Sequence, residues 1–446
     1  MVSEPGSSLP EETRRTVRKW RVRVFIAAWT MYATYYLCKV NFSIAVPALK
    51  KFLGGGVATE ESEMMVGTIM TALFLAYALG QVVNGLLGDR FGPRKVGTIG
   101  MLVSATMNLL FGLVGSYPAF LAIWAVNGFF QATGAPSRIK VLSNWFPPKE
   151  RGKMMGFLGT DYVVGNAVCW LLAGWLLQNY GWRYVFIVPA FIFFASAAHF
   201  FFRVRNAPED VGLPTLEELE GKKKASSSEK PEGAGGDDHA GWSFVFKQTF
   251  LNPKVWIVAF AYFGVDLFRY GFLGWSFDYI VSQGAPVGKG VIKVVMVPAF
   301  GAVGIILSGW LSDKIGGRRA PVTAVMLFIV AGLAWVFRLL PAGEGNFWLP
   351  LITLAGIGFF LYGPHLMMGA TIAMDLGSRK ASATASGIID AMGYLGAAVT
   401  GIGTAKAKEL WGWDGAFLLW ISGAVIAGIL MLFLWNYKVE EDREYL

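Results

Sequence analysis

Blocks of about twenty apolar residues, separated by short polar links, recur along this chain. A helix rises about 1.5 Å per residue, so each block is long enough to cross the hydrocarbon core of a bilayer. Hydrophobic residues make up 54% of the chain, and the mean hydropathy is +0.49. A soluble protein of 446 residues is rarely so apolar. The sequence therefore predicts an all-α membrane protein with many membrane-spanning helices.

The apolar blocks predict twelve membrane-spanning helices, with a long polar linker after the sixth. The expected spans are residues 24–49, 64–88, 96–114, 118–142, 153–178, 183–203, 254–282, 290–312, 320–340, 347–374, 383–406 and 413–437. The expected parts are an N-terminal segment (1–23), a six-helix bundle (24–203), a linker (204–253), a second six-helix bundle (254–437) and a tail (438–446). The linker is rich in charge, Gly, Ser and Pro, so we expect it to be solvated and mostly disordered.

Lysine and arginine are distributed unequally between the two sides of the predicted membrane. The segment 1–23, the linker and the loops after even-numbered spans carry most of them, which indicates that both termini are cytoplasmic. No short apolar core with a cleavage site precedes the first span, so we expect no cleaved signal and a location in a plasma membrane, such as a bacterial inner membrane. The net charge of +9 arises from basic residues beside the apolar blocks, and nucleic acid is not an expected partner.

The two groups of six spans resemble each other. The stretch GLLGDRFGPRK (85–95) follows the second span, and GWLSDKIGGRR (309–319) follows the eighth, at the equivalent place in the second group. NYGWRYVF at the start of the sixth span is similar to LWGWDGAF at the start of the twelfth. Duplication of a six-helix unit explains both pairs and predicts two pseudo-symmetric bundles, the parallel-repeat arrangement of secondary transporters.

The first of these loops resembles the loop signature of the major facilitator superfamily, and the second is a degenerate copy. The matching residues are Gly85, Asp89, Arg90, Gly92, Arg94 and Lys95. The glycines permit a tight turn, and an acid among basic residues predicts a cytoplasmic charge latch that opens when the bundles rock. We therefore expect gating roles for Asp89, Arg90, Arg94, Asp313 and Arg318.

Two basic residues lie deep within the apolar spans. Lys39 lies near the middle of the first span, where a lysine costs about 2.5–3.5 kcal/mol to insert. Tyr32 and Tyr36 precede it at helical spacing and share part of its face. Arg269 lies deep in the seventh span, and its offset from Lys39 is close to that between the repeated loops, so the two cations are expected pseudo-symmetry mates facing a central pore. An ammonium and a guanidinium together suit a phosphate monoester.

Most of the chain also resembles the organophosphate:phosphate antiporters, which exchange glycerol 3-phosphate or hexose phosphates for inorganic phosphate. The resemblance is carried by YYLCKVNFSIAVPAL (35–49), PEDVGLP (208–214), LFRYGFLGWSFDYI (267–280), SGWLSDK (308–314), LYGPHLMMG (361–369) and ASGIIDAMGYLG (385–396). It implies that Lys39 and Arg269 bind the phosphate group, with Tyr36 and Tyr32 beside them.

Three positions depart from the pattern of that family. Lys39 stands where arginine is usual, and Gln81 where a lysine of the second span is usual. In RGKMMGFLGTDYVVGN (151–166), Tyr162 replaces the histidine of the fifth-span signature. We expect Gln81, Tyr162 and Tyr394 to shape the pocket.

Three acidic residues lie deep within the expected spans, away from their ends: Asp161, Asp266 and Asp390. If all three ionise against Lys39 and Arg269 alone, the local charge is −1, which repels an anion. Lys293 could balance it, one aspartate could be held protonated, or the substrate could carry a cation beside its anionic group. Asp266, one helical turn before Arg269, could simply neutralise it. We expect the three acids and Lys293 to tune charge or carry a proton.

These features predict a secondary active transporter with alternating access, which exchanges a small phosphorylated organic anion for inorganic phosphate. Two alternatives stay open: a proton-coupled symporter of another organic anion or zwitterion, and a membrane sensor of hexose phosphate. No nucleotide loop, metal-ligand cluster or nucleophile–base pair occurs in the sequence, so no enzyme activity, cofactor or metal is expected. The expected partners are the organic anion, inorganic phosphate or a proton, and the lipid bilayer, and we expect a monomer.

Overall fold

The computed structural model describes residues 10–147, 154, 157–219, 249–341 and 346–437, and every regular element in these residues is helical. The helices are α1 (Glu11–Leu37), α2 (Asn41–Leu53), α3 (Glu60–Phe91), α4 (Pro93–Leu113), α5 (Tyr117–Gln131), α6 (Gly134–Trp145), α8 (Thr160–Tyr180), α9 (Tyr184–Arg203), η1 (Pro208–Val211), α10 (Leu216–Leu219), α12 (Pro253–Ser282), α13 (Val287–Lys314), α14 (Arg319–Leu339), α15 (Trp348–Leu366), the π-helix η2 (Met367–Ile372) and α16 (Ala373–Leu432).

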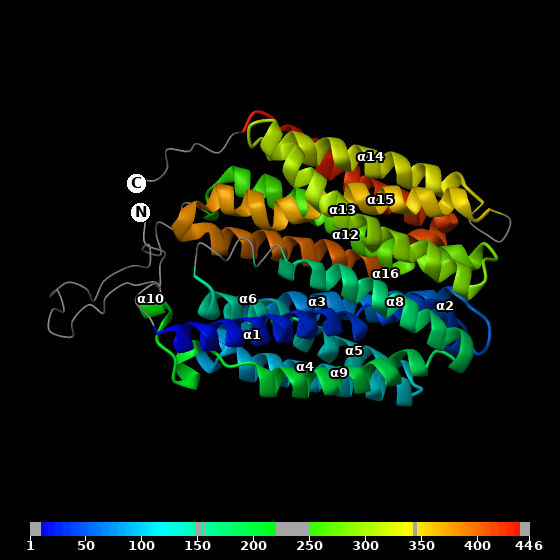
Figure 1. Ribbon diagram of the computed structural model, residues 1–446. Coiled ribbons are helices and arrows are strands. Elements are labelled where there is room, and N and C mark those ends of the chain that lie inside the picture. The colour runs from blue at the N-terminus through cyan, green and yellow to red at the C-terminus, as the bar shows by residue number, and fades with distance from the viewer. Residues whose placement is uncertain (1–9, 148–153, 155–156, 220–248, 342–345, 438–446) are drawn as a thin grey trace.

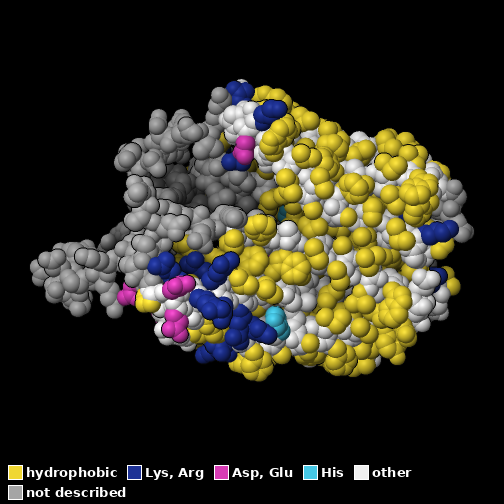
Figure 2. All heavy atoms as spheres, viewed as in Figure 1, with side chains coloured by type: hydrophobic (Ala, Val, Ile, Leu, Met, Phe, Trp, Pro, Cys, Tyr) yellow, Lys and Arg dark blue, Asp and Glu magenta, His cyan; other side chains and the backbone are white. Residues whose placement is uncertain are grey.

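The helices form two groups that lie side by side along one long axis (Figure 1). The N-terminal half, α1–α9, occupies the lower part of the view, and the C-terminal half, α12–α16, the upper part. We call the end where α1 begins and α10 lies the linker end, and the end where α2 and α12 finish the distal end. Figure 2 shows hydrophobic side chains over most of the surface, with Lys and Arg gathered at the linker end of the N-terminal half.

Nine helices in the described part of the chain are long and apolar enough to cross a membrane. The first and fourth expected spans are missing from these nine because each is broken, into α1 and α2 and into α5 and α6. The apolar segment Ala385–Leu432 is long enough for two crossings. It folds back at Gly412, whose φ of +63° is a left-handed conformation, and Trp420 Nε1 donates a hydrogen bond to Thr404 Oγ1. Together with the two broken spans, the nine helices therefore account for the twelve expected crossings.

The first helix begins at Glu11, well before the expected start of the first span, so part of the N-terminal segment extends α1. The start of the linker is folded, in contrast to the disorder expected from its composition. The side chain of Asn206 accepts a hydrogen bond from the Arg94 backbone, and its carbonyl accepts one from Asn144. Trp145 Nε1 donates to the Arg205 carbonyl. These contacts attach the start of the linker to the linker end of α4 and α6, while residues 220–248 lie outside the described residues.

The two halves contact each other through α3 and α16, α8 and α13, and α2 and α12. Near the distal end, α3 and α16 approach backbone to backbone: a Cβ atom on Gly67 would lie 2.6 Å from the Gly401 carbonyl oxygen. The Thr71 hydroxyl donates to the Ala398 carbonyl at 2.7 Å. Small residues at these crossings let the halves pack closely.

Four charged side chains, two of them buried and two partly buried, join the halves at the same end. Lys50 Nζ lies 2.8 Å from Glu63 Oε1 and 2.7 Å from Asp278 Oδ2. Lys408 Nζ lies 2.7 Å from Glu63 Oε1 and 3.7 Å from Asp278 Oδ2. Each half contributes one lysine and one acid, so the network is neutral and each half supplies partners to the other. We call these four residues the distal charge network.

Candidate anion-binding site between the two halves

Lys39 lies in the break between α1 and α2. The break leaves the Cys38 carbonyl without a helical partner, and inside a membrane such a group must find one in the protein. The amide side chains of Asn108 and Asn127 donate to it at 3.0 Å each, and Gln131 donates at 3.2 Å. Amides from α4 and α5 therefore stabilise the break, and the break presents Lys39 at the interface between the halves.

Tyrosine rings surround the ammonium group of Lys39. Its Nζ atom lies 4.2 Å from the Tyr77 ring centre, 5.5 Å from that of Tyr270, 5.7 Å from that of Tyr394 and 5.9 Å from that of Tyr36. Two of these rings come from each half. No carboxylate of the described residues lies within 4 Å of Nζ, so cation–π attraction takes the place of an ion pair and leaves the charge available to an anion.

Arg269 of α12 lies on the other side of the interface and has several partners. Its Nη1 atom lies 3.0 Å from His365 Nε2 and 3.8 Å from Asp266 Oδ1. Asp266 therefore pairs with Arg269, as one alternative from the sequence proposed, and it also lies 3.3 Å from His365 Nε2. The Tyr262 hydroxyl is 3.0 Å from the same nitrogen. Arg269 Nε is buried and has no hydrogen-bond partner in the described structure.

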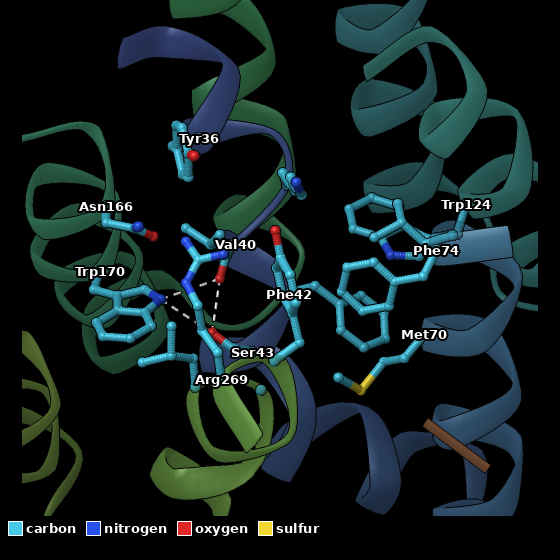
Figure 3. A pocket seen from close by; sticks show the side chains of 15 residues that line it. Tyr36, Val40, Phe42, Ser43, Met70, Phe74, Trp124, Asn166, Trp170 and Arg269 are labelled. Carbon is cyan, nitrogen blue, oxygen red and sulfur yellow. Dashed lines mark hydrogen bonds between the residues drawn. The ribbon is translucent and has the colours of Figure 1, made fainter. Parts of the chain in front are cut away.

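Lys39 and Arg269 line one small cavity of about 50 Å³, which has room for several water molecules. Figure 3 shows Tyr36, Asn166 and Trp170 on one side of it, and Phe74, Trp124 and Met70 on the other. Trp170 Nε1 donates to the Ser43 hydroxyl at 3.0 Å and holds this wall in place. Buried Asn166 Oδ1, like Arg269 Nε, lacks a hydrogen-bond partner among the described residues. A cavity with two cations and unpaired polar atoms is suited to a small polar anion.

A second charged cluster belongs to the N-terminal half alone. Arg138 Nη1 forms an ion pair with Asp161 Oδ2, and both side chains are largely buried. The guanidinium lies over the Tyr32 ring, 3.5 Å from its centre. With Arg138 included, the acids Asp161, Asp266 and Asp390 are matched in number by the cations Lys39, Arg138 and Arg269, so the formal charge of −1 considered from the sequence becomes zero.

The same three positions occur in the C-terminal half. Tyr262, His365 and Asp390 follow Tyr32, Arg138 and Asp161 in the same order and at nearly the spacing that separates Lys39 from Arg269. In both halves the tyrosine and the basic side chain are in contact. We call these sets the N-terminal triad (Tyr32, Arg138, Asp161) and the C-terminal triad (Tyr262, His365, Asp390).

Asp390 differs from its counterpart Asp161. No cationic nitrogen in the described residues lies within 4 Å of the Asp390 carboxylate. The charged side chain that interacts with it electrostatically is another acid, Asp266, and this interaction is repulsive when both are ionised. One turn further along α16, a Cβ atom on Gly393 would lie 2.6 Å from Asp266 Oδ2, so α16 packs directly against this acid. The C-terminal half therefore holds two neighbouring carboxylates.

The structure also positions the other residues that the sequence singled out. Tyr162 stacks on Tyr362 across the interface with ring centres 5.8 Å apart, and Tyr394 lies 4.3 Å from Tyr77. Gln81 is half-buried on α3, one turn beyond Tyr77 towards the linker end, and does not line the cavity. Lys293 lies elsewhere: its Nζ donates to the Asn346 carbonyl and contacts the Phe347 ring, so it does not balance the central acids.

The described contacts of the two loop motifs stay within their own halves. Arg94 Nε donates to the Phe201 carbonyl, and Arg90 lies beside Phe91. Asp313 lies 4.0 Å from Arg319. Arg318 lies at the start of α14, and the side chain of Asp89 is outside the described part of the structure. The expected charge latch between these loops stays a prediction.

Sequence reasoning left two site residues out: Arg138 was not singled out, and His365 was considered as a pore-facing residue but not included in the site. Arg138 is near the end of an expected span and close to Lys140, so it resembles an ordinary flanking charge. His365 lies within the quoted stretch LYGPHLMMG, but no local pattern there marks it as a pocket residue. The signal that could have found both is their separation along the chain, which is close to the offset of the repeat.

Comparisons with known proteins agree with this architecture. Residues 24–401 match the family described as Major Facilitator Superfamily. A probable hexose phosphate transport protein of Chlamydia trachomatis is 30% identical over 98% of this chain and 95% of its own length. The membrane sensor protein UhpC of Escherichia coli is 28% identical over 95% of this chain and 94% of its length.

Among solved structures, a bacterial homologue of the human lysosomal transporter Spinster has the same fold. The TM-score is 0.69 at 16% identity, over 93% of this chain and 95% of the other. A sequence identity of 16% indicates only a shared fold. The family match and the similarity to the hexose phosphate transport protein, by contrast, extend over most of the chain. The chain therefore belongs to the major facilitator superfamily and, within it, to the organophosphate:phosphate antiporter family.

Proposed function

We propose that this protein exchanges a small phosphorylated organic anion, of the hexose phosphate or glycerol 3-phosphate class, for inorganic phosphate across a membrane. The observation that supports this most directly is that Lys39 and Arg269, one from each half, line the same cavity. A phosphate group between them would form charge-assisted hydrogen bonds to both halves at once. Rocking of the halves about such a site would expose it to each side in turn.

The two cations would have different tasks in this exchange. Lys39 is held by aromatic rings and faces no carboxylate of the described residues, so it attracts an anion as a point charge. Arg269 is fixed by His365 and Asp266, which orient its planar group while Nε stays unpaired. Tyr36 and Tyr270 line the cavity beside these cations. Their hydroxyl groups would donate hydrogen bonds to substrate oxygens.

The test is counterflow in proteoliposomes loaded with phosphate, using a panel of phosphorylated compounds outside. We expect Lys39→Gln and Arg269→Gln each to reduce exchange at least about a hundredfold, because each removes a charged partner of the phosphate. Lys293→Gln is the matched control, since it removes a buried lysine that lies outside the cavity. Normal exchange in both cavity variants would refute the proposed site.

Because the chain is similar to a membrane sensor protein, sensing of a phosphorylated compound is a second candidate function. The same vesicles can test it. A sensor would bind the phosphorylated compound without exchanging it, so binding without counterflow would favour that alternative. Uptake that is driven by an imposed pH gradient and needs no internal phosphate would favour a proton-coupled symporter. We further propose that the linker end is cytoplasmic, because Lys and Arg gather there.

A further inference from the structure

One nitrogen atom of His365 lies within reach of three polar groups of α12. Its Nε2 atom is 3.0 Å from Arg269 Nη1, 3.0 Å from the Tyr262 hydroxyl and 3.3 Å from Asp266 Oδ1. The histidine comes from α15, so its ring connects two helices of the C-terminal half. The matching N-terminal position is an arginine, Arg138, which has no equivalent choice of protonation state.

A single imidazole nitrogen cannot satisfy these neighbours at the same time. An arginine N–H only donates a hydrogen bond, and a carboxylate oxygen only accepts one. When Nε2 carries no proton, its lone pair can accept from Arg269 but offers nothing to Asp266. When Nε2 is protonated, it can donate to Asp266 but no longer accepts from Arg269. Nε2 therefore has two states. The protonated one is either the neutral tautomer, in which the proton has moved from Nδ1, or the imidazolium, which holds one proton more and carries a positive charge.

The surrounding atoms show what each state leaves unpaired. Asp266 Oδ1 is buried and has no hydrogen-bond partner within the described structure, so a proton on His365 Nε2 would supply one. The His365 side chain is 18% exposed, which gives a proton a route to the ring. Arg269 Nε is buried and unpaired as well, so a guanidinium released from His365 can turn its N–H groups to an anion.

We propose that His365 is a proton-operated positioning residue for Arg269. Unprotonated, it accepts a hydrogen bond from Arg269 and holds the guanidinium; protonated, it donates to Asp266, releases Arg269 and adds a positive charge beside the cavity. The inference rests on the proposed function, because it assigns a phosphate to Arg269. The titratable or charged groups that face His365 are Tyr262, Asp266 and Arg269 on α12, and Lys39 at the break between α1 and α2. Asp390 on α16 is a charged neighbour of Tyr262 and Asp266.

Proton binding and phosphate binding are then mutually favourable. A protonated His365 strengthens the field that attracts a phosphate dianion, and a bound dianion stabilises the protonated ring. Thermodynamic linkage requires the two effects to be equal. The site would therefore select the dianionic form of its substrate and bind one proton with it.

The first experiment measures binding of inorganic phosphate to the purified full-length protein between about pH 6 and pH 8, the range in which histidine titrates. His365→Gln keeps an acceptor for Arg269 and a donor for Asp266 at every pH. The titration of phosphate itself is common to both proteins, so the difference between the two profiles reports on His365. We expect wild-type affinity, relative to His365→Gln, to rise about tenfold as the pH falls across this range.

His199→Gln is the matched control, because His199 lies near the linker end of α9, outside the cavity. We expect its profile to follow that of the wild type. His365→Asn serves as the second variant if His365→Gln does not insert. The second readout is proton exchange on phosphate binding in weak buffer, where the wild type should take up more protons than the His365 variant.

The outcomes separate this inference from the proposed function. If the wild type and both His365 variants bind phosphate with parallel pH profiles and equal proton exchange, His365 is only structural and the inference is wrong. If none of the proteins binds phosphate at any pH, the proposed function fails and the inference fails with it.

Discussion

The N-terminal and C-terminal triads occupy matching positions but differ in chemistry. In the N-terminal triad, Arg138 forms a fixed ion pair with Asp161 and lies over a tyrosine ring. In the C-terminal triad, His365 shares one nitrogen among three neighbours, and Asp390 has no cation within 4 Å in the described structure. The repeat thus retains the order and spacing of the three residues, but only the C-terminal copy contains a histidine, the side chain whose ordinary pKa lies near neutral pH.

The largest expected effect is a difference in the free energy of unfolding between a variant of the N-terminal triad and a variant of the C-terminal triad. Arg138→Gln leaves Asp161 buried without its cation, which we expect to lower the free energy of unfolding by about 3–5 kcal/mol. His365→Gln removes no permanent charge and should lower it by less than about 1 kcal/mol. Thermal unfolding of the purified proteins in one detergent measures the difference.

The double variant Arg138→Gln/Asp161→Asn is the control for this prediction. It removes both charges, so most of the lost stability should return, as a double-mutant cycle would show. Equal melting temperatures for wild type and Arg138→Gln would mean that the ion pair contributes nothing, and the contrast between a fixed and a titratable triad would fail.

The sequence predicted the fold class and the facing pair Lys39 and Arg269, because block length, repeat offset and buried charge are local signals. It did not predict the break at Cys38–Val40, since the amides that stabilise it, Asn108, Asn127 and Gln131, come from other spans. It also offered Lys293 as one of three ways to balance the charge of the central acids, whereas the Lys293 ammonium group contacts Asn346 and Phe347. Depth along a helix can be estimated from sequence, but the direction in which a side chain points depends on tertiary packing.

The next prediction concerns how the halves are joined at the distal end. Lys50 and Asp278 form a buried pair across the interface, and Glu63 and Lys408 form a partly buried one. Asp278→Asn weakens this connection, because two lysines then share a single acid. We expect the distal end to open more often, so that a cysteine introduced at Ser43 in the cavity reacts several-fold faster with an impermeant thiol reagent added from that side.

Glu409→Gln is the matched control for the distal charge network. Glu409 pairs with Lys406 on the same helix, and this more exposed pair does not connect the halves. The control should leave the labelling rate unchanged. An equal increase in both variants would show that the labelling reports a general loosening of α16 instead of separation at the distal charge network.

The smallest expected effect returns to the two aspartates of the triads. Asp161→Asn deprives Arg138 of its partner, whereas Asp390→Asn removes a carboxylate whose charged neighbour is another carboxylate, Asp266. Because like charges repel, we expect Asp390→Asn to change the free energy of unfolding by less than about 1 kcal/mol, with a slight gain in phosphate affinity. Melting temperature and phosphate binding, measured on both variants, test this. A loss of stability as large as that of Asp161→Asn would show that Asp390 is paired in the membrane, and the two triads would then be equivalent in charge.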